Sequence, residues 1–598
     1  MIRLTELKLP LSALPLVTRR AADAPAESGA DRLPDLHPLA ALRQLCATAL
    51  GLAPSDITQL QVFKRSFDAR KAALLAVYCV DLALADAAQE ASVLARFQNH
   101  PHIGPTPDMA YRLVARAPAN LPLRPVVVGF GPCGIFAALL LAQMGFRPIV
   151  LERGKPVRER TRDTWDLWRK HQLNPESNVQ FGEGGAGTFS DGKLWSQIKD
   201  PRHLGRKVME EFVKAGAPAE ILVEAHPHIG TFKLVKVVEN LREQITALGG
   251  EIRFGQLVTD IEVDGAPARR QVRGLSVRNQ TTGQINEIRA DQVIMALGHS
   301  ARDTFAMLHQ RGVMIEAKPF SVGFRIEHPQ SLIDRARWGR HAGHPSLGAA
   351  DYKLVHHASN GRGVYSFCMC PGGMVVAATS EPGRVVTNGM SQYSRNERNA
   401  NAGLVVGIEP ADFPQDSTAF IEAFGAVAGS EYAQQAIESR AFEARSVHPL
   451  AGINLQRQLE SGAFLLGGSN YEAPGQLVGE FLRGQASGSL GSVQPSYQPG
   501  VRLCDLSLSL PDYAIAALRE ALPVFGKKIK GFDMPDAVLT GVETRTSSPL
   551  RLPRGDDYQS INTAGLYPGG EGAGYAGGIL SAGVDGIKLA EALARSLT

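Results

Sequence analysis

The feature that most restricts the fold of this chain is a run of valines that leads directly into a glycine-rich turn. Residues 126–134 read VVVGFGPCG, and the apolar stretch that follows, residues 135–144, stops at Gly145. A buried strand, a tight glycine turn and a helix, in this order, are typical of the first βαβ unit of a parallel sheet. The helix N-terminus, with its partial positive charge, then lies beside the turn. The pattern therefore predicts a Rossmann-like α/β layer that binds the pyrophosphate of a dinucleotide.

An acidic residue at the end of the next expected strand supports the same interpretation. Glu152 follows residues 147–151 and lies 23 positions after Gly129. In such units an acidic side chain accepts hydrogen bonds from the ribose hydroxyls, and we expect Glu152 to bind both hydroxyls of an unphosphorylated ribose. The alternative is a βαβ unit without a ligand. We predict as cofactor-binding residues in this region Gly129, Gly131, Pro132, Cys133, Gly134, Glu152 and Arg153.

Segments far away in the sequence favour FAD over NAD. A glycine-rich loop at 565–578 leads into an expected final helix, 579–596, more than 400 residues after the first motif. A helix placed there would point its N-terminus at the flavin N1/C2=O edge, where negative charge accumulates on reduction. The alternatives are a glycine-rich helix cap here and ordinary loops at 182–192 and 296–304. We predict FAD contacts in these loops from Gly185, Gly187, Ser190, Ala296, Gly298, Gly570, Glu571, Gly574, Tyr575, Ala576 and Gly577.

The changing pattern along the chain predicts an α/β fold in which a Rossmann-like FAD-binding domain is interrupted by a strand-rich substrate or cap domain. A small α+β N-terminal domain of βαββα order precedes it. We expect residues 231–248 to form a helix, and 251–263, 272–278 and 291–297 to be strands of the same α/β layer; 415–440 and 511–528 look helical. The predicted boundaries are 1–118, 119–316, 317–535 and 536–598, the last segment returning to the FAD-binding domain.

Several longer stretches carry a resemblance to a known family. They include RSFDARK, GGAGTFSDGKL, KPFSVGFRIEHPQ, GVYSFCMCPGG, GVETRTSSPLR and YPGGEGAGYAGGI. From about Lys64 to its end, the chain resembles the uncharacterised bacterial FAD-dependent dehydrogenases, which are related in layout to flavoproteins of the glutathione-reductase and p-hydroxybenzoate-hydroxylase types. The resemblance implies bound FAD and redox chemistry, and it names no substrate.

Polar residues beside the predicted flavin loops are the candidates for catalysis. We predict His299, Arg302 and Arg545 at the flavin face, where an arginine can stabilise anionic reduced flavin and a histidine can move a proton. Surface ion pairing is the alternative for each. Cys368 and Cys370 share one face of an expected strand, which suggests either a redox-active pair or, more simply, core packing, because residues two apart in an extended strand rarely form an unstrained disulfide.

Composition limits the remaining possibilities. The 63 basic and 59 acidic residues leave a net charge of only +4, so we expect no nucleic acid partner, and His226 and His228 lack the further ligands of a metal site. No stretch reaches the roughly 18 apolar residues of a membrane span, and six scattered cysteines indicate a reducing compartment. We therefore expect a cytoplasmic enzyme without a metal or a membrane partner.

The favoured function is an oxidoreductase, a dehydrogenase with non-covalent FAD that passes hydride or electrons between a small organic substrate and an external donor or acceptor. One alternative is a flavin monooxygenase that uses NAD(P)H and O2. Another is a flavin-containing module that binds RNA or a protein through basic residues of the N-terminal domain, Lys64, Arg65, Arg70 and Lys71. The sequence identifies neither the substrate nor the oligomeric state.

Overall fold

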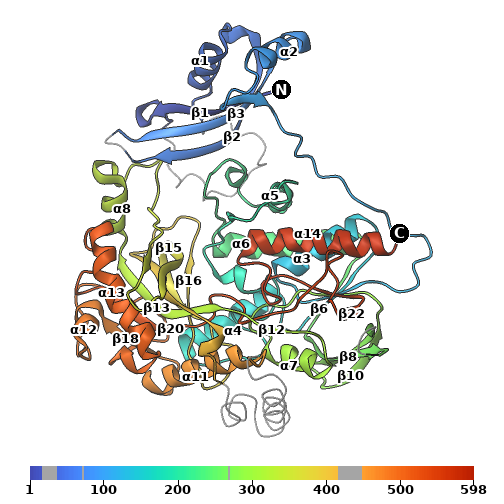
Figure 1. Ribbon diagram of the computed structural model, residues 1–598, viewed down its shortest axis with the longest axis vertical. Coiled ribbons are helices and arrows are strands. Elements are labelled where there is room, and N and C mark those ends of the chain that lie inside the picture. The colour runs from blue at the N-terminus through green and yellow to red at the C-terminus, as the bar shows by residue number, and fades with distance from the viewer. Residues whose placement is uncertain (16–36, 71–72, 267–269, 415–446) are drawn as a thin grey trace.

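The computed structural model describes residues 1–15, 37–70, 73–266, 270–414 and 447–598 (Figure 1). Its N-terminal part is a small domain in which four strands pair in the order β2-β3-β1-β4. Two helices lie on the face of this sheet that points away from the rest of the molecule (Figure 1). The predicted βαββα order is confirmed. The elements are β1 (Ile2–Pro10), α1 (Leu39–Leu50), β2 (Ile57–Asp68), β3 (Leu75–Leu84), α2 (Ala87–Arg96) and β4 (Ile103–Pro105).

The valine run forms the middle of a five-stranded parallel sheet with the order β23-β11-β5-β6-β7. Strand β23 comes from the C-terminal part of the chain and pairs with β11 at the edge of the sheet, so the sheet is complete only when this distant segment is in place. This confirms the interrupted Rossmann-like fold. The elements are β5 (Val126–Val128), α3 (Pro132–Gln143), β6 (Ile149–Glu152), α6 (Thr231–Ala247), β7 (Glu251–Phe254), β11 (Val293–Met295), β23 (Leu566–Pro568) and α14 (Ile579–Ser596).

Helices α3 and α14 pack with their backbones in close contact at the centre of the molecule (Figure 1). A Cβ atom at Gly586 would lie 2.2 Å from the carbonyl oxygen of Cys133, and one at Gly583 would lie 3.0 Å from the Phe136 ring. Glycine is therefore required at Gly586, and Gly583 leaves little space for a larger residue. Neither these helices nor any other helix in the described part of the chain is long and apolar enough to cross a membrane.

The prediction that residues 251–263 and 272–278 extend the same α/β layer is correct only for β7, and it is wrong for residues 256–263 and 272–278. Strands β8 (Gln256–Asp264), β9 (Arg270–Asn279) and β10 (Ile285–Arg289) pair antiparallel in a separate sheet, which β22 (Thr563–Ala564) joins. Consecutive strands joined by short turns pair with each other, whereas a parallel neighbour in the main layer needs a long crossover connection. Gly255, with φ +64°, turns the chain between β7 and β8 into the new direction.

The region between the two halves of the FAD-binding fold is built on an eight-stranded sheet, with β16 beside β15 and the other strands in the order β14-β15-β17-β13-β20-β18-β19. Strand β20 belongs to it, although the predicted boundary assigns residue 536 onward to the FAD-binding domain. The expected helix at 511–528 is confirmed, and the one at 415–440 lies outside the described residues. The elements are β13 (Phe320–Pro329), α8 (Gln330–Trp338), β14 (Val355–His357), β15 (Gly363–Ala377), β16 (Thr387–Ser391), β17 (Asn399–Ile408), α11 (Ala451–Leu466), β18 (Ala473–Leu477), α12 (Val478–Arg483), β19 (Val501–Leu503), α13 (Asp512–Lys528) and β20 (Val538–Glu543).

The N-terminal domain is held to the body of the molecule by strand-like contacts of β2. The Arg65 amide donates to the carbonyl of Val223 (2.6 Å), and the Ala225 amide donates to the carbonyl of Arg65 (2.9 Å). The Arg65 guanidinium also pairs with Glu224. Arg70 pairs with Asp68 at 2.7 Å. Two of the basic side chains considered for RNA binding are therefore engaged within the protein.

Candidate functional site

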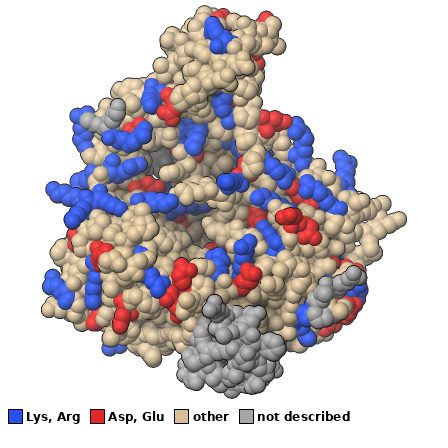
Figure 2. Space-filling model, in the orientation of Figure 1, with Lys and Arg blue, Asp and Glu red and all other residues tan. Residues whose placement is uncertain are grey.

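A cavity of about 1150 Å³ lies between the carboxyl ends of the parallel strands and the eight-stranded sheet. At one end it is lined by the turn after β5 and the end of β6, and at the other by β15 and the C-terminal end of α13. Figure 2 shows a hollow in this part of the surface, below the N-terminal domain. Ligands of α/β sheets bind at the carboxyl ends of the strands, so this cavity is the candidate cofactor site.

Most of the predicted site residues line this single cavity, although they come from four distant segments. The lining residues among them are Gly129, Gly131, Pro132, Cys133, Glu152, Arg153, Gly185, Gly187, Ser190, Ala296, Gly298, His299, Arg545, Glu571 and Gly577. Six others do not line it: Gly134, Arg302, Gly570, Gly574, Tyr575 and Ala576. Gly134 instead lets α3 approach the preceding turn, since a Cβ there would lie 1.9 Å from the carbonyl oxygen of Gly129.

The N-termini of α3 and α14 meet at the cavity. A Cβ at Gly187 would lie 2.9 Å from Ile579, the first residue of α14, and 3.6 Å from Pro132, the first residue of α3. The first backbone N–H groups of a helix have no partner within the helix and attract anions. The cavity is therefore bordered by two sets of such N–H groups, one from α3 and one from α14. At Gly131 a Cβ would have only the Cα of Gly185 near it, at 3.6 Å, and at Gly577 nothing within 4 Å. Bare backbone that borders open space fits a diphosphate and a flat ring.

Most of the hydrogen-bond acceptor positions of the Glu152 carboxylate are used by the protein itself, although its predicted role is to bind a ribose. Its carboxylate accepts hydrogen bonds from the amides of Phe130 (2.9 Å), Gly154 (2.8 Å) and Gly182 (2.9 Å). A carboxylate offers about four acceptor positions, so one remains for a ligand. Glu152 therefore anchors the surrounding loops and has room for one ribose hydroxyl, where two are predicted.

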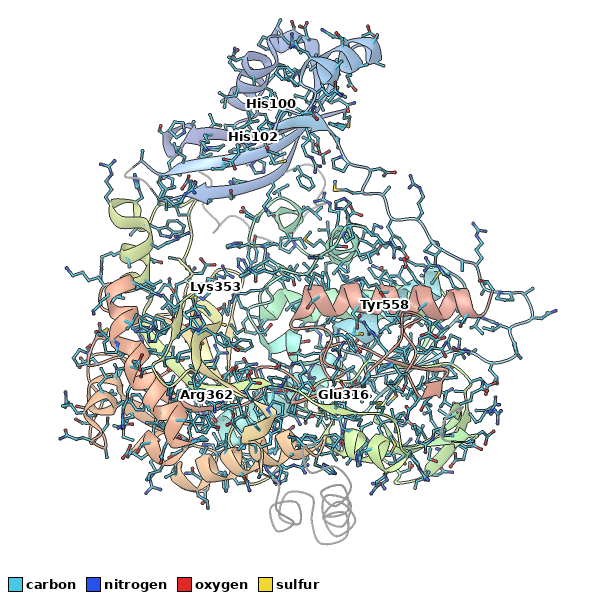
Figure 3. The ribbon with its side chains drawn as sticks, viewed as in Figure 1. His100, His102, Glu316, Lys353, Arg362 and Tyr558 are labelled. Carbon is cyan, nitrogen blue, oxygen red and sulfur yellow. The ribbon has the colours of Figure 1, made fainter. Side chains whose placement is uncertain are left out.

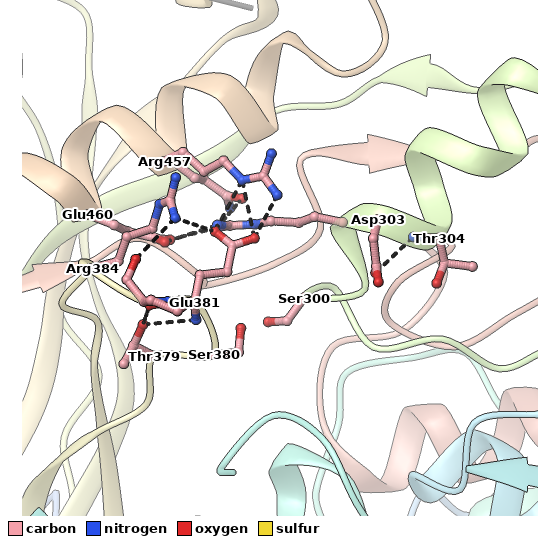
Figure 4. A network of polar contacts seen from close by, with 12 residues as sticks. Ser300, Asp303, Thr304, Thr379, Ser380, Glu381, Arg384, Arg457 and Glu460 are labelled. Atoms are coloured by element: carbon pink, nitrogen blue, oxygen red, sulfur yellow. Dashed lines mark hydrogen bonds and ion pairs between the residues drawn. The ribbon is translucent and has the colours of Figure 1, made fainter. Parts of the chain in front are cut away.

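Arg545 and Arg302 share a buried network centred on Glu460. Figure 4 labels Glu460 and its neighbours Ser300 and Ser380 in this network. Arg545 donates to the Glu460 carboxylate (3.0 and 2.8 Å), to Ser300 Oγ (3.0 Å) and to Ser380 Oγ (2.7 Å). Arg302 donates to Glu460 (2.7 and 3.0 Å) from the far side of the cavity wall. Although burial opposes ionisation, the two guanidinium charges lower the pKa of Glu460 to about 2. The network fixes Arg545 in the wall of the cavity.

Two titratable side chains in the cavity wall have strongly shifted pKa values. Burial, helped by the charges of Arg545 and Arg302, lowers the pKa of His299 to about 3, so its imidazole is neutral at pH 7. Burial and the nearby Cys368 sulfur raise the pKa of Glu571 to about 7, against the opposing charge of Lys318. Glu571 is therefore better suited than His299 to take up and release a proton near neutral pH.

The wall opposite the turn after β5 is built from segments that meet only in the folded chain, so the sequence did not predict that its residues lie together. The rings of Trp195 and His226 stack there, with centroids 4.8 Å apart, and His226 Nδ1 lies 3.5 Å from the carboxylate of Asp351. His228 instead hydrogen-bonds to the carbonyl of Tyr393 (3.0 Å), so the two histidines have different neighbours. The wall ends in exposed basic side chains: Arg337, Lys353 and Lys528.

These three basic residues define what we call the basic rim of the cavity. Figure 3 labels Lys353, close to β15, and Lys353 lines the cavity. Lys and Arg side chains are prominent around the hollow in Figure 2. A rim of one charge sign raises the local concentration of ligands of the opposite sign.

Comparison with known proteins identifies a family. A family model described as "FAD-dependent protein, C-terminal domain-like" matches residues 319–546, and a domain of unknown function matches residues 1–83. An uncharacterized protein of Clostridium beijerinckii is 45% identical over 551 residues, which are 91% of this chain and 93% of that protein. The similarity thus extends through the N-terminal domain, the parallel sheet and the eight-stranded sheet.

Parts of the chain are also similar to parts of solved structures. Glycerol-3-phosphate dehydrogenase from Bacillus halodurans, complexed with FAD, has a TM-score of 0.25 and 12% identity over 48% of this chain and 47% of its own. Anhydrotetracycline hydroxylase from Streptomyces rimosus has a TM-score of 0.21 and 17% identity over 48% of this chain and 44% of its own. The chain spans less than half the length of either. The long match to the Clostridium protein and the FAD-dependent domain decide the assignment: the chain belongs to the bacterial family of FAD-dependent proteins that its motifs resemble, and its cofactor is FAD.

Proposed function

We propose that the protein is an FAD-dependent oxidoreductase that transfers hydride or electrons between a small organic substrate and an external donor or acceptor. The observation that carries the proposal is the continuity of one cavity from the turn after β5 to the side chains of β15. Typical ligand pockets measure roughly 300–1,000 Å³, so a cavity of about 1150 Å³ has space beyond a single drug-sized ligand. A cofactor and a small substrate would share it.

The residues divide the cavity into parts that suit different portions of FAD. The start of α3 and Glu152 would hold the diphosphate and one ribose hydroxyl. The segment from Gly185 to Ser190 and the start of α14 would face the ring, which supplies the redox chemistry when bound. A helix N-terminus beside the ring stabilises negative charge there, by about 0.3–1 kcal/mol for an exposed site and more when partly buried.

Protein side chains would manage protons and substrate charge around the ring. Glu571, with a pKa raised to about 7 by burial and by Cys368, is half protonated at neutral pH and would exchange the proton that accompanies each hydride. Arg545 stays charged and fixed by Glu460, and would bind a substrate carboxylate or an anionic ring. The basic rim favours a negatively charged substrate.

The first experiment is an absorption spectrum of the purified protein, followed by denaturation and identification of any yellow cofactor released. Released FAD supports non-covalent binding in the cavity. A colourless protein that does not take up added FAD contradicts the proposal. Anaerobic reduction with NADH or NADPH, followed by addition of oxygen, separates a dehydrogenase from a monooxygenase, since only the latter couples rapid reoxidation to hydroxylation of a substrate.

A cytoplasmic location is also part of the proposal. All six cysteines are free thiols in the structure, which suits a reducing compartment. Fractionation of cells that produce the chain with a small epitope tag tests it, and recovery of the tag with the envelope fraction would contradict it.

A further inference from the structure

Cys368 and Cys370 lie in a distorted part of β15, where the sequence predicted a regular extended strand. The pairing of β15 with β17 passes from Phe367↔Gly403 to Cys370↔Asn401, so β15 holds one extra residue at this point. Cys368 has φ +42°, a left-handed conformation that is uncommon outside glycine and is found preferentially at functional sites. Cysteines two apart in an extended strand rarely form an unstrained disulfide, but this argument does not apply to Cys368 and Cys370, because β15 is not regular here.

The two sulfurs are neighbours with different surroundings. Cys368 lines the cavity, whereas Cys370 is fully buried behind it. The Cys370 thiol is shared between the carbonyl oxygen of Cys368, 3.3 Å away, and the Cys368 sulfur. This hydrogen bond, and the positive charges of Lys193 and Arg325, lower the pKa of Cys368 well below its usual range, while the pKa of Cys370 is raised.

The cations that stabilise the Cys368 thiolate are themselves fixed by the backbone around it. Arg325 Nη1 donates to the carbonyl oxygen of Cys368 (2.9 Å), and Lys193 Nζ donates to the carbonyl oxygen of Met369. Arg325 is fully buried and also pairs with Glu543 (2.9 Å). An ordinary core cysteine in apolar surroundings is an inert thiol, so this arrangement of cations is unusual for packing alone.

The pair also lies next to the loop proposed to contact the flavin. The charge of Cys368 contributes to the raised pKa of Glu571, so the two groups are within electrostatic reach of each other. Both line the same cavity, as do Gly187 and Gly577 from the proposed ring site. A thiolate, a buried resolving thiol and the ring site are thus brought together from three separate segments of the chain.

We propose that Cys368 and Cys370 are a redox-active dithiol–disulfide pair that exchanges two electrons with the bound FAD. This rests on the proposed function, because it requires the flavin in the cavity. In the oxidising direction the Cys368 thiolate and the Cys370 thiol form one S–S bond, and the Cys370 thiol loses its proton. The electron pair and this proton go to the oxidised flavin, and FAD becomes FADH⁻. The reverse direction breaks the S–S bond and regenerates the Cys368 thiolate and the Cys370 thiol.

The test is an anaerobic dithionite titration of the holoenzyme after oxidation with ferricyanide and removal of the reagent. We expect full reduction to take four electrons per flavin in the unmodified protein, two for the flavin and two for the disulfide. Cys368→Ser and Cys370→Ser should each take two. Cys79→Ser is the matched control, since Cys79 is a half-buried thiol in β3 that does not line the cavity, and it should still take four.

A thiol count gives a second readout that needs no variant. After denaturation, the ferricyanide-oxidised protein should show four of its six thiols, and the dithionite-reduced protein all six. Six thiols in both states, or two electrons per flavin in the unmodified holoenzyme, would overturn the pair while leaving the oxidoreductase proposal intact. Failure to bind FAD at all would instead contradict the proposed function, so the two failures are distinguishable.

Discussion

Replacing Gly131 with valine should remove FAD binding and leave the fold in place. The backbone at Gly131 has φ −81°, which valine adopts without strain, and a Cβ there approaches only the Cα of Gly185, at an ordinary 3.6 Å. The new methyl groups would project into the cavity beside the N-terminus of α3. The fold therefore tolerates the change, but the valine side chain occupies the space that the diphosphate needs.

The size of the effect follows from the contacts that the diphosphate would lose. A hydrogen bond from a backbone amide to a charged group contributes about 1.5–3 kcal/mol, and displacing the diphosphate breaks at least two of them. A loss of about 3 kcal/mol or more corresponds to a Kd raised by over 100-fold. The expected cost to the free energy of unfolding is about 1 kcal/mol, because valine caps a helix less well than glycine.

The assay is titration of the apoprotein with FAD, followed by flavin fluorescence, together with urea unfolding. Gly363→Val is the matched control: it inserts the same side chain where no atom lies within 4 Å and where the residue does not line the cavity. Its FAD affinity should equal that of the unmodified protein. If Gly131→Val also binds FAD normally, the diphosphate does not lie at the start of α3 and the assignment of the cavity is wrong.

Other predictions concern charge. Glu571→Gln should raise the free energy of unfolding of the apoprotein by about 3 kcal/mol at pH 8 and by almost nothing at pH 4.5, as urea unfolding would show. The folded pKa of about 7 lies above the unfolded value near 4.5, so the stability that the protonated carboxyl provides below pH 4.5 is lost as the pH rises to 7. Glu460→Gln, which leaves the buried Arg545 without a carboxylate and Arg302 with only that of Glu381, should lower the free energy of unfolding by about 3–5 kcal/mol. A change under about 1 kcal/mol would contradict the network. Lys353→Ala with Lys528→Ala should slow reoxidation of the reduced holoenzyme by ferricyanide several-fold at low salt, and stopped-flow traces at about 0.5 M salt should show no difference if the basic rim acts by attraction at a distance.

Local patterns in the sequence predicted the parts of the site that depend on local conformation. The turn at Gly129 and Gly131 needs only the order strand, turn, helix, and the final helix has the predicted bounds, Ile579–Ser596. The separate sheet of β8–β10 was missed because strand pairing depends on connections and partners, not on the strand's own residues. The opposite wall of the cavity was missed for the same reason: Trp195 and Asp351 belong to no motif, and only the folded chain brings them together.

The distortion at Cys368 shows a second limit of sequence patterns. The alternation around residues 363–377 predicts a strand correctly, but the extra residue in β15 depends on its pairing with β17. Arg302 is a similar case. It was predicted to lie at the flavin ring because it is close in sequence to a predicted flavin loop, but in the structure its guanidinium pairs with the buried Glu460 instead. The positions of such residues in the sequence identify them as candidates for the site, but buried ion pairs determine the direction in which their side chains point.

The packing of α14 against α3 has a consequence for how the protein is made. Helix α3 is apolar on all sides, and one side is covered only by residues near the end of a chain of 598. While the ribosome is still adding those residues, the nascent chain exposes that surface and lacks one wall of the cavity, which makes it prone to aggregate. FAD would thus be acquired only after α14 has been synthesised, and chains that terminate before α14 should be both colourless and dependent on chaperones.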